Sequence, residues 1–132
     1  MTEVAPIEAR MMQMVFPDDT NHMGTLFGGR ALAWMDMAAF MVASRYSRRT
    51  VVTANSDRID FQAPVKQGAL VELIARVHKV GRSSMQVAVE MYSEDLLSGE
   101  RQLATRGLFT MVALGPDGKP TPVPALSPSS GP

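Results

Sequence analysis

A single carboxylate stands in an otherwise apolar stretch of the chain. From Ala31 to Ala43 every residue is apolar except Asp36. Alanine, leucine and methionine favour helix, and neither proline nor glycine interrupts the run after Gly29. A helix that is hydrophobic on all sides is expected to be buried, where an ionised carboxylate is costly unless it is paired, hydrogen-bonded or catalytic. Asp36 is therefore the first candidate for a functional residue.

The neighbouring segments predict the elements that hold Asp36. Residues 9–16 are typical of a strand that ends at Pro17, and residues 17–24 form a polar loop rich in turn formers. Gly28 and Gly29 open the helix, where the lack of side chains lets other backbone or a ligand approach its N-terminus. Alternating apolar and polar residues predict further strands over residues 50–62, 69–80, 85–92 and 101–114, with a hairpin turn at 95–100.

The short connections between these strands imply an antiparallel meander, because a parallel pair needs a long crossover. The fold that we expect is therefore α+β, with one curved antiparallel sheet wrapped around one long buried helix. At 132 residues the chain predicts a single domain over residues 1–124. Residues 125–132 are expected to form a flexible tail.

Composition excludes several kinds of function. Lysine plus arginine and aspartate plus glutamate each total 13, so neither a nucleic-acid nor a membrane-surface partner is expected. The absence of cysteine excludes disulfides, thiolate metal sites and a cysteine nucleophile. No secretory signal is visible, and no apolar run reaches the roughly 20 residues that span a bilayer. We expect a soluble, cytoplasmic protein without a metal site.

The segment from Asn21 to Asp36 resembles a known family. It contains Asn21-x-x-Gly24-x-x-Phe27-Gly28-Gly29 followed by Trp34-Met35-Asp36. This pattern resembles the active-site segment of the hotdog-fold acyl-CoA thioesterases. The likeness is closer to the group of YciA and the brain-type acyl-CoA hydrolases. The likeness continues through Val52-Thr53-Ala54, Gly81-Arg82-Ser83-Ser84 and Gly118-Lys-Pro-Thr-Pro-Val-Pro124. It implies hydrolysis of an acyl-CoA thioester to a free acid and CoA, with no cofactor because CoA is part of the substrate. It also implies a homodimer with active sites at the subunit interface, and often a hexamer built as a trimer of dimers.

The resemblance assigns roles to particular residues. Asp36 is expected to act as general base or as nucleophile, and Asn21 to orient water or the substrate. The helix N-terminal amides at Gly28 and Gly29 are expected to polarise the carbonyl, with Gly28 counted as catalytic and Gly29 as substrate-binding. The remaining substrate or CoA contacts are expected from Thr53 and from Arg82, Ser83 and Ser84, whose guanidinium and hydroxyl groups suit phosphates.

Helical spacing adds a prediction about assembly. Gly29 and Asp36 share a helix face but lie about 10 Å apart along the axis. One thioester carbonyl cannot reach both within hydrogen-bond distances of roughly 3 Å. We therefore expect Asn21 and the glycine amide to come from one subunit and Asp36 from its partner.

Two other functions compete with thioester hydrolysis on the sequence alone. A hotdog dehydratase would carry a catalytic histidine in its own signature, which this chain lacks. A non-catalytic protein that binds or senses acyl-CoA would not require Asn21 together with Asp36. His22 is interpreted as a loop residue and His78 as ordinary surface.

Overall fold

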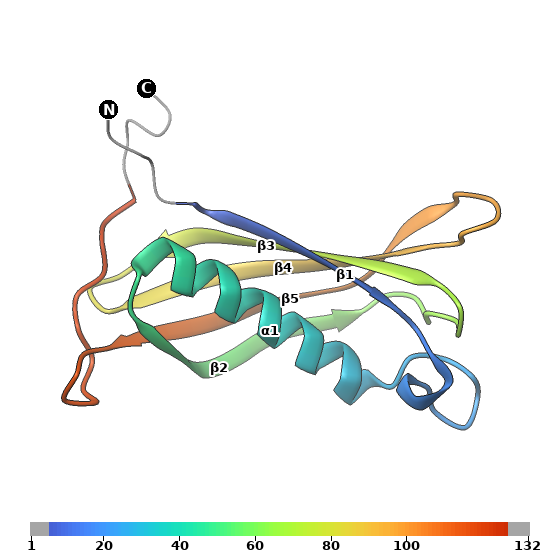
Figure 1. Cartoon of the computed structure of the whole chain (residues 1–132), viewed down its shortest axis with the longest axis horizontal. Helices are drawn as coiled ribbons and strands as arrows, with labels where there is room; N and C mark the ends of the chain where they lie inside the picture. Colours follow the sequence, from blue (N-terminus) through green and yellow to red (C-terminus); the bar gives the residue numbers. More distant parts are fainter. Residues whose placement is uncertain (1–5, 127–132) are drawn as a thin grey trace.

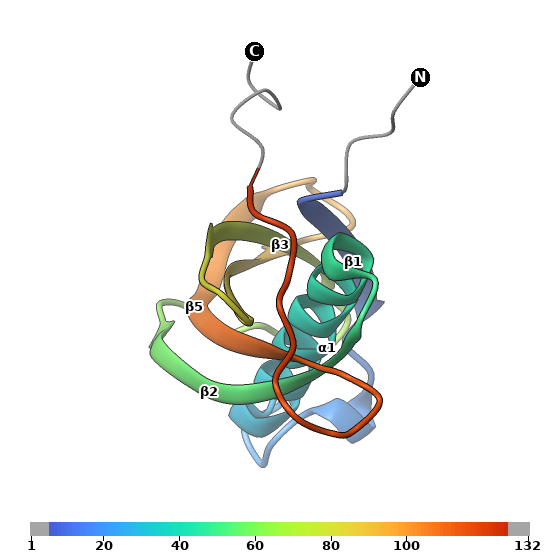
Figure 2. The same cartoon turned by 90° about the vertical axis from the view of Figure 1, so that its left-hand side faces the viewer.

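The computed structural model describes residues 6–126 as one antiparallel sheet packed on one long helix (Figure 1). The elements, in chain order, are β1 (Glu8–Met14), the 3₁₀ helix η1 (Pro17–Asp19), α1 (Gly28–Ser47), β2 (Thr50–Phe61), β3 (Leu70–Val80), β4 (Ser84–Glu94) and β5 (Arg101–Leu114). The curved sheet wraps around α1 when seen along the helix (Figure 2). The expected α+β architecture is confirmed.

The order of the strands differs from the expected simple meander. The sheet runs β1-β3-β4-β5-β2, and all neighbouring pairs are antiparallel. Only β3, β4 and β5 follow one another as a meander, because β2 pairs with β5 at the far edge. The connection from β2 to β3 is tied across the end of the sheet by the bonds Leu26 N–H to Val65 O (2.7 Å) and Gly68 N–H to Val15 O (2.8 Å). The sequence pattern predicted the strands but not their order in the sheet, because the order depends on non-local contacts.

The core lies between α1 and the inner face of the sheet. Alternate residues of the central strands are fully buried there, among them Val71, Leu73 and Ala75 of β3, Met85, Val87 and Val89 of β4, and Phe109 and Met111 of β5. Met35, Ala38, Ala39 and Val42 of α1 are also fully buried. Since alanine adds little bulk, its repeated use on this helix face lets the sheet approach closely.

One face of α1 is left open within a single chain, in contrast to the expectation of a helix buried on all sides. Ala33 is exposed, Met37 is 47% exposed and Phe40 is 49% exposed. These residues are spaced at intervals of three and four, so they form one stripe along the helix. The apolar sequence of α1 thus contributes to two surfaces, the core of its own chain and an outward stripe that the described residues leave exposed.

The C-terminal segment packs across the end of the sheet at which α1 finishes. The Tyr46 hydroxyl donates to the carbonyl oxygen of Pro124 at 2.6 Å. Val123 N–H donates to the carbonyl oxygen of Arg82 at 2.9 Å. Residues up to Leu126 therefore belong to the packed structure, and residues 127–132, where the predicted flexible tail ends, lie outside the described part of the chain. No helix within residues 6–126 is long and apolar enough to cross a membrane.

An ion-pair network crosses the outer face of the sheet. Glu72 of β3 contacts Arg101 of β5 at 2.8 Å and Arg10 of β1 at 3.3 Å. Burial alone would raise the pKa of Glu72, but the hydrogen bonds from the two guanidinium groups outweigh it and hold the pKa below its ordinary value of 4.5. The network joins strands that are distant in sequence, so its loss acts on the whole sheet.

The lowered pKa of Glu72 predicts a defined pH dependence of stability. Its contribution is present above the unfolded-state pKa of 4.5 and is lost as the pH falls through the lower folded-state value. We expect Glu72→Gln to reduce the free energy of unfolding at pH 7 by less than about 1 kcal/mol, because both arginines are partly exposed. The deficit should shrink below pH 4. Urea denaturation at a series of pH values tests this, and parallel curves for variant and wild type would contradict it.

Candidate active site

Asp36 lies on α1 beside the open stripe, where it faces the edge strand β2. Its side chain is half-buried, and its Oδ1 accepts a hydrogen bond from the Thr53 hydroxyl at 2.5 Å. The same hydroxyl oxygen lies 3.5 Å from the Met111 sulfur. Asp36 Oδ2 has no hydrogen bond within the described residues. The threonine therefore fixes one oxygen of the carboxylate and leaves the other available for chemistry.

Asn21 is held by its own loop through one end of its amide. Its Oδ1 accepts bonds from the backbone N–H of Met23 (2.9 Å), from the backbone N–H of Thr25 (3.1 Å) and from the Thr25 hydroxyl (3.1 Å). Because backbone N–H groups can only donate, the side-chain oxygen must face them and the amide NH₂ points away. That NH₂ group has no hydrogen bond within residues 6–126. The loop thus presents a donor, and Thr25, which the sequence alone did not indicate, holds it in place.

The N-terminus of α1 offers unpaired backbone donors beside Gly28 and Gly29. The helix begins at Gly28, and the side chain of Phe27, which precedes it, makes no capping hydrogen bond. The first N–H groups of a helix have no partner within the helix. A Cβ on Gly29 would meet no atom within 4 Å, and one on Gly28 would make only ordinary contact with Phe61 at 3.7 Å. Packing within the chain does not demand either glycine, so both leave open space above the donors.

The structure does not bring all the predicted residues together in one chain. Because α1 is a continuous helix from Gly28, Asp36 lies about 12 Å from Gly28 along the axis. The Asn21 loop lies at the Gly28 end of the helix (Figure 1). Within one chain the predicted residues therefore form two separate groups, one with Asn21 and the helix N-terminus and one with Asp36 and Thr53.

The predicted CoA-binding turn lies at the opposite end of the molecule. Arg82 and Ser83 connect β3 to β4, which begins at Ser84, near the C-terminus of α1, whereas the Asn21 loop lies beyond its N-terminus (Figure 1). Gly81 N–H donates to Ser84 O at 2.9 Å, and a Cβ on Gly81 would lie 2.9 Å from the Ser84 hydroxyl oxygen, so a larger residue there would displace that hydroxyl. The exposed Arg82 side chain forms no ion pair within the described residues.

The two histidines do not join these groups into a metal site. His22 is exposed in the Asn21 loop, and His78 is exposed on β3. Across the described residues, no three His, Asp or Glu side chains are grouped so that they could hold a metal ion. The groups that the predicted site residues offer are a carboxylate, an amide, a hydroxyl and backbone N–H groups, a set suited to acyl transfer to water.

Residues 23–100 match the sequence profile of the Thioesterase superfamily, and the chain belongs to this family. The predicted hotdog fold is confirmed by solved structures. A hexameric acyl-CoA thioesterase, solved without ligand, is 42% identical with a TM-score of 0.89 over 93% of this chain and 81% of that one. An acyl-CoA hydrolase from Staphylococcus aureus, solved with butyryl-CoA, CoA and CoA disulfide, is 38% identical with a TM-score of 0.86 over 89% and 72% of the two chains.

A curated relative points to the same group of enzymes. The acyl-CoA thioester hydrolase YkhA of Bacillus subtilis, described as uncharacterized, is 46% identical over 116 residues, which cover 88% of this chain and 67% of that protein. Solved structures of the Staphylococcus aureus hydrolase include single alanine variants of an asparagine, an aspartate and a threonine.

Proposed function

We propose that this chain hydrolyses acyl-CoA thioesters, as the names of its relatives indicate. In this proposal Thr53 positions the carboxylate of Asp36, and Asn21 and Gly28 supply the hydrogen-bond donors. The observation that carries the proposal is the 2.5 Å hydrogen bond from Thr53 to a half-buried carboxylate whose second oxygen is open. The turn aspartates Asp95 and Asp117 bind backbone N–H groups of their own turns, whereas Asp36 binds only a side-chain hydroxyl of another element. Asp36 instead faces outward beside an uncovered apolar stripe.

Residue spacing in a relative supports the same three side chains. The asparagine, aspartate and threonine replaced in the Staphylococcus aureus hydrolase are separated by 15 and 17 positions. Asn21, Asp36 and Thr53 are separated by the same two intervals. This agreement ties the three residues to positions that were singled out for substitution in a protein of the same family.

The proposed reaction uses the donors and the carboxylate on opposite sides of the thioester. The carbonyl oxygen accepts hydrogen bonds from the Gly28 N–H and the Asn21 NH₂ group, which stabilise the negative charge that develops there. Asp36 Oδ2 takes a proton from water as the water oxygen attacks the carbonyl carbon. The C–S bond then breaks, and the CoA sulfur leaves with that proton as a thiol. In an alternative mechanism the Asp36 carboxylate attacks the carbonyl carbon itself and CoA leaves as its thiolate. Water then hydrolyses the mixed anhydride that has formed.

We further propose that two copies of the chain complete each site. Strand β2 is an edge strand, and nearly all of its side chains are exposed. The hydrogen bond from Thr53 to Asp36 places this edge beside α1, whose open stripe carries Met37 and Phe40. An unpaired strand edge beside an apolar stripe is suited to antiparallel pairing with the same edge of a second copy, which buries both features.

Two-fold pairing also accounts for the two separate groups of site residues. The symmetry operation reverses the direction of β2, so the Asn21 end of one copy lies beside the Arg82 end of the other. Asp36 of the partner copy then faces the Gly28 donors, and the turn at Arg82–Ser84 of the partner reaches the CoA phosphates. A hexameric relative supports the further proposal that three such dimers assemble.

Changing Thr53 tests the proposed role of the Asp36 hydrogen bond. We expect Thr53→Val, which keeps the shape but removes the hydroxyl, to lower kcat about 10- to 100-fold with a smaller change in KM, because the carboxylate loses its orientation. Thr53→Ser should recover most of the activity. The assay follows thiol release from acyl-CoAs of several chain lengths.

The matched pair of Thr53 variants separates positioning from substrate binding. If Thr53 mainly contacts substrate, Thr53→Val raises KM and leaves kcat near the wild-type value. Equal kcat values for the valine and serine variants would remove the hydrogen bond from the mechanism.

A further inference from the structure

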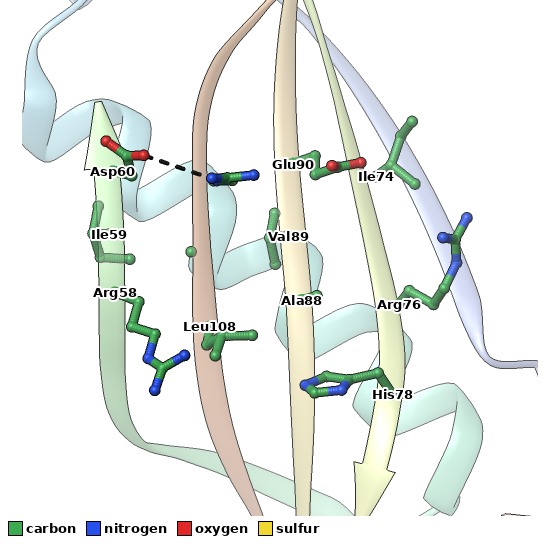
Figure 3. A pocket seen from close by; sticks show the side chains of 12 residues that line it. Arg58, Ile59, Asp60, Ile74, Arg76, His78, Ala88, Val89, Glu90 and Leu108 are labelled. Atoms are coloured by element: carbon green, nitrogen blue, oxygen red, sulfur yellow. Dashed lines mark ion pairs between the residues drawn. The ribbon is translucent and has the colours of Figure 1, made fainter. Parts of the chain in front are cut away.

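A cavity lies on the outer face of the sheet, on the side away from α1 (Figure 3). Its volume is about 730 Å³, within the range of small-molecule sites. The floor consists of apolar side chains from three adjacent strands, Ile74 of β3, Ala88 of β4 and Leu108 of β5. Asp36 and Thr53 do not line it. The proposed hydrolytic mechanism therefore leaves this groove without a function.

A bulge in β2 directs Arg58 over the groove. Asp57 pairs with Leu108 and Asp60 with Arg106, so Arg58 and Ile59 together oppose the single residue Gly107. A Cβ on Gly107 would overlap with the Ile59 side chain, so the glycine makes room for Ile59 on the core side.

The backbone of Arg58 is constrained by this bulge. Arg58 has φ +53°, in the left-handed region that residues other than glycine rarely adopt, and its N–H donates to Asp57 Oδ1 at 2.8 Å. Its side chain extends across the outer face of the sheet toward Leu108 (Figure 3). A strained backbone that places a cation over a cavity points to a ligand more than to packing.

The charges of the groove are divided between its two ends. At one end Arg106 contacts Asp60 at 3.8 Å, and Glu90 lies at the same end (Figure 3). Arg76 also lines the groove, but its guanidinium is ion-paired with Glu8. At the other end Arg58 and His78 project over the floor from opposite walls (Figure 3). Neither Arg58 nor His78 forms an ion pair or a side-chain hydrogen bond within the described residues. The groove therefore has one end where a guanidinium and an imidazole make no contact with the carboxylates of the groove.

We infer that this groove binds a small organic anion, with its phosphate or carboxylate between Arg58 and His78 and its apolar body on Ile74, Ala88 and Leu108. A guanidinium forms strong, often bidentate, hydrogen bonds with either oxyanion. The apolar floor favours a ligand with an apolar body over a bare inorganic ion, because such a body would cover the floor. Anion binding in this groove is independent of the proposed hydrolytic function.

Binding of phenyl phosphate and hexanoate to the full-length protein tests this assignment. Titration calorimetry at low salt should show binding of at least one of the two anions and no binding of the neutral hexanamide. Tighter binding of hexanoate identifies carboxylic acids as the ligand class, and tighter binding of phenyl phosphate identifies phosphorylated compounds. Arg58→Asn should weaken the preferred anion about tenfold or more, and His78→Gln should also weaken it. Asparagine suits the left-handed backbone at residue 58 better than arginine does.

A matched control shows whether the loss of affinity belongs to the groove. Arg49→Asn removes an exposed arginine outside the groove and should leave anion binding unchanged. The rate of thiol release by Arg58→Asn reports separately on the hydrolytic site. Equal anion affinity in Arg58→Asn and wild type would overturn the proposed anion site. The anion site would also be overturned if neither anion binds and Arg58→Asn has a lower oligomer mass in analytical ultracentrifugation. That result would mean that the groove is a contact between copies of the chain.

Discussion

Replacement of Asp36 by asparagine is expected to lower kcat for acyl-CoA hydrolysis about 10²- to 10⁴-fold, the range found for loss of a general base. Asparagine has nearly the same shape, and its side-chain oxygen can still accept the hydrogen bond from Thr53. The fold and the binding of CoA esters should therefore persist. Thiol release from a panel of acyl-CoAs of different chain lengths measures the effect, with the thermal unfolding temperature as a check on folding.

A matched control shows whether the loss of activity is specific to position 36 or follows from any exchange of aspartate for asparagine. Asp117→Asn makes the same substitution in an exposed turn near the C-terminus and should retain wild-type kcat. If Asp36→Asn keeps activity near wild type, Asp36 has no catalytic role. If the wild-type chain binds acyl-CoA but releases no thiol at any chain length, the alternative of an acyl-CoA-binding or sensing protein is favoured.

Mixing two inactive variants is expected to restore activity. A dimer with Asn21→Ala in one chain and Asp36→Asn in the other has one site that carries both substitutions and one site that carries neither. A purified mixed dimer should therefore show about half of the wild-type activity, because two-fold symmetry gives two sites. Each variant alone should stay inactive. Differently tagged chains, purified in sequence over both tags, supply the mixed dimer for the thiol-release assay.

The reverse result has an equally clear meaning. If Asn21 and Asp36 of the same chain serve one site, each site of the mixed dimer carries one substitution, and no activity returns. A verified mixed dimer that stays inactive would thus reject the shared site but leave hydrolysis itself standing. The experiment depends on the separation of about 12 Å along α1, which follows from the helical rise and which neither variant alters.

The sequence predicted the elements of the fold because its patterns are local. Alternation in β3, β4 and β5 and the apolar run of α1 each identify one element without reference to the others. The placement of β2 beside β5 was not predictable in this way, since it depends on how the β2–β3 connection packs against Leu26 and Val15. The open stripe of α1 was missed for a related reason. Hydropathy shows that a side chain avoids water but not whether its own chain or another covers it.

The candidate site was predictable where residue type alone carries the signal. Asp36 stands out as a charge in an apolar helix, and Asn21 with the glycines stands out through the family resemblance. The contact between Thr53 and Asp36 was not predicted, because it joins two elements 17 positions apart through packing. The position of Arg58 over the outer groove was equally hidden, since it follows from the bulge opposite Gly107. Local patterns identify chemical groups, and tertiary structure decides which of them meet.

The irregular edge of β2 has a consequence for molecular recognition in a crowded cell. A long, regular, unpaired strand invites addition of any extended peptide, and this leads to aggregation. Register shifts at Thr53/Asn55 and at Asp57/Asp60 interrupt the edge, so its hydrogen-bonding groups do not follow the even spacing of an ordinary strand. A strand from another protein can form hydrogen bonds along only part of this edge before the register is lost. The two interruptions therefore limit indiscriminate strand pairing along this edge.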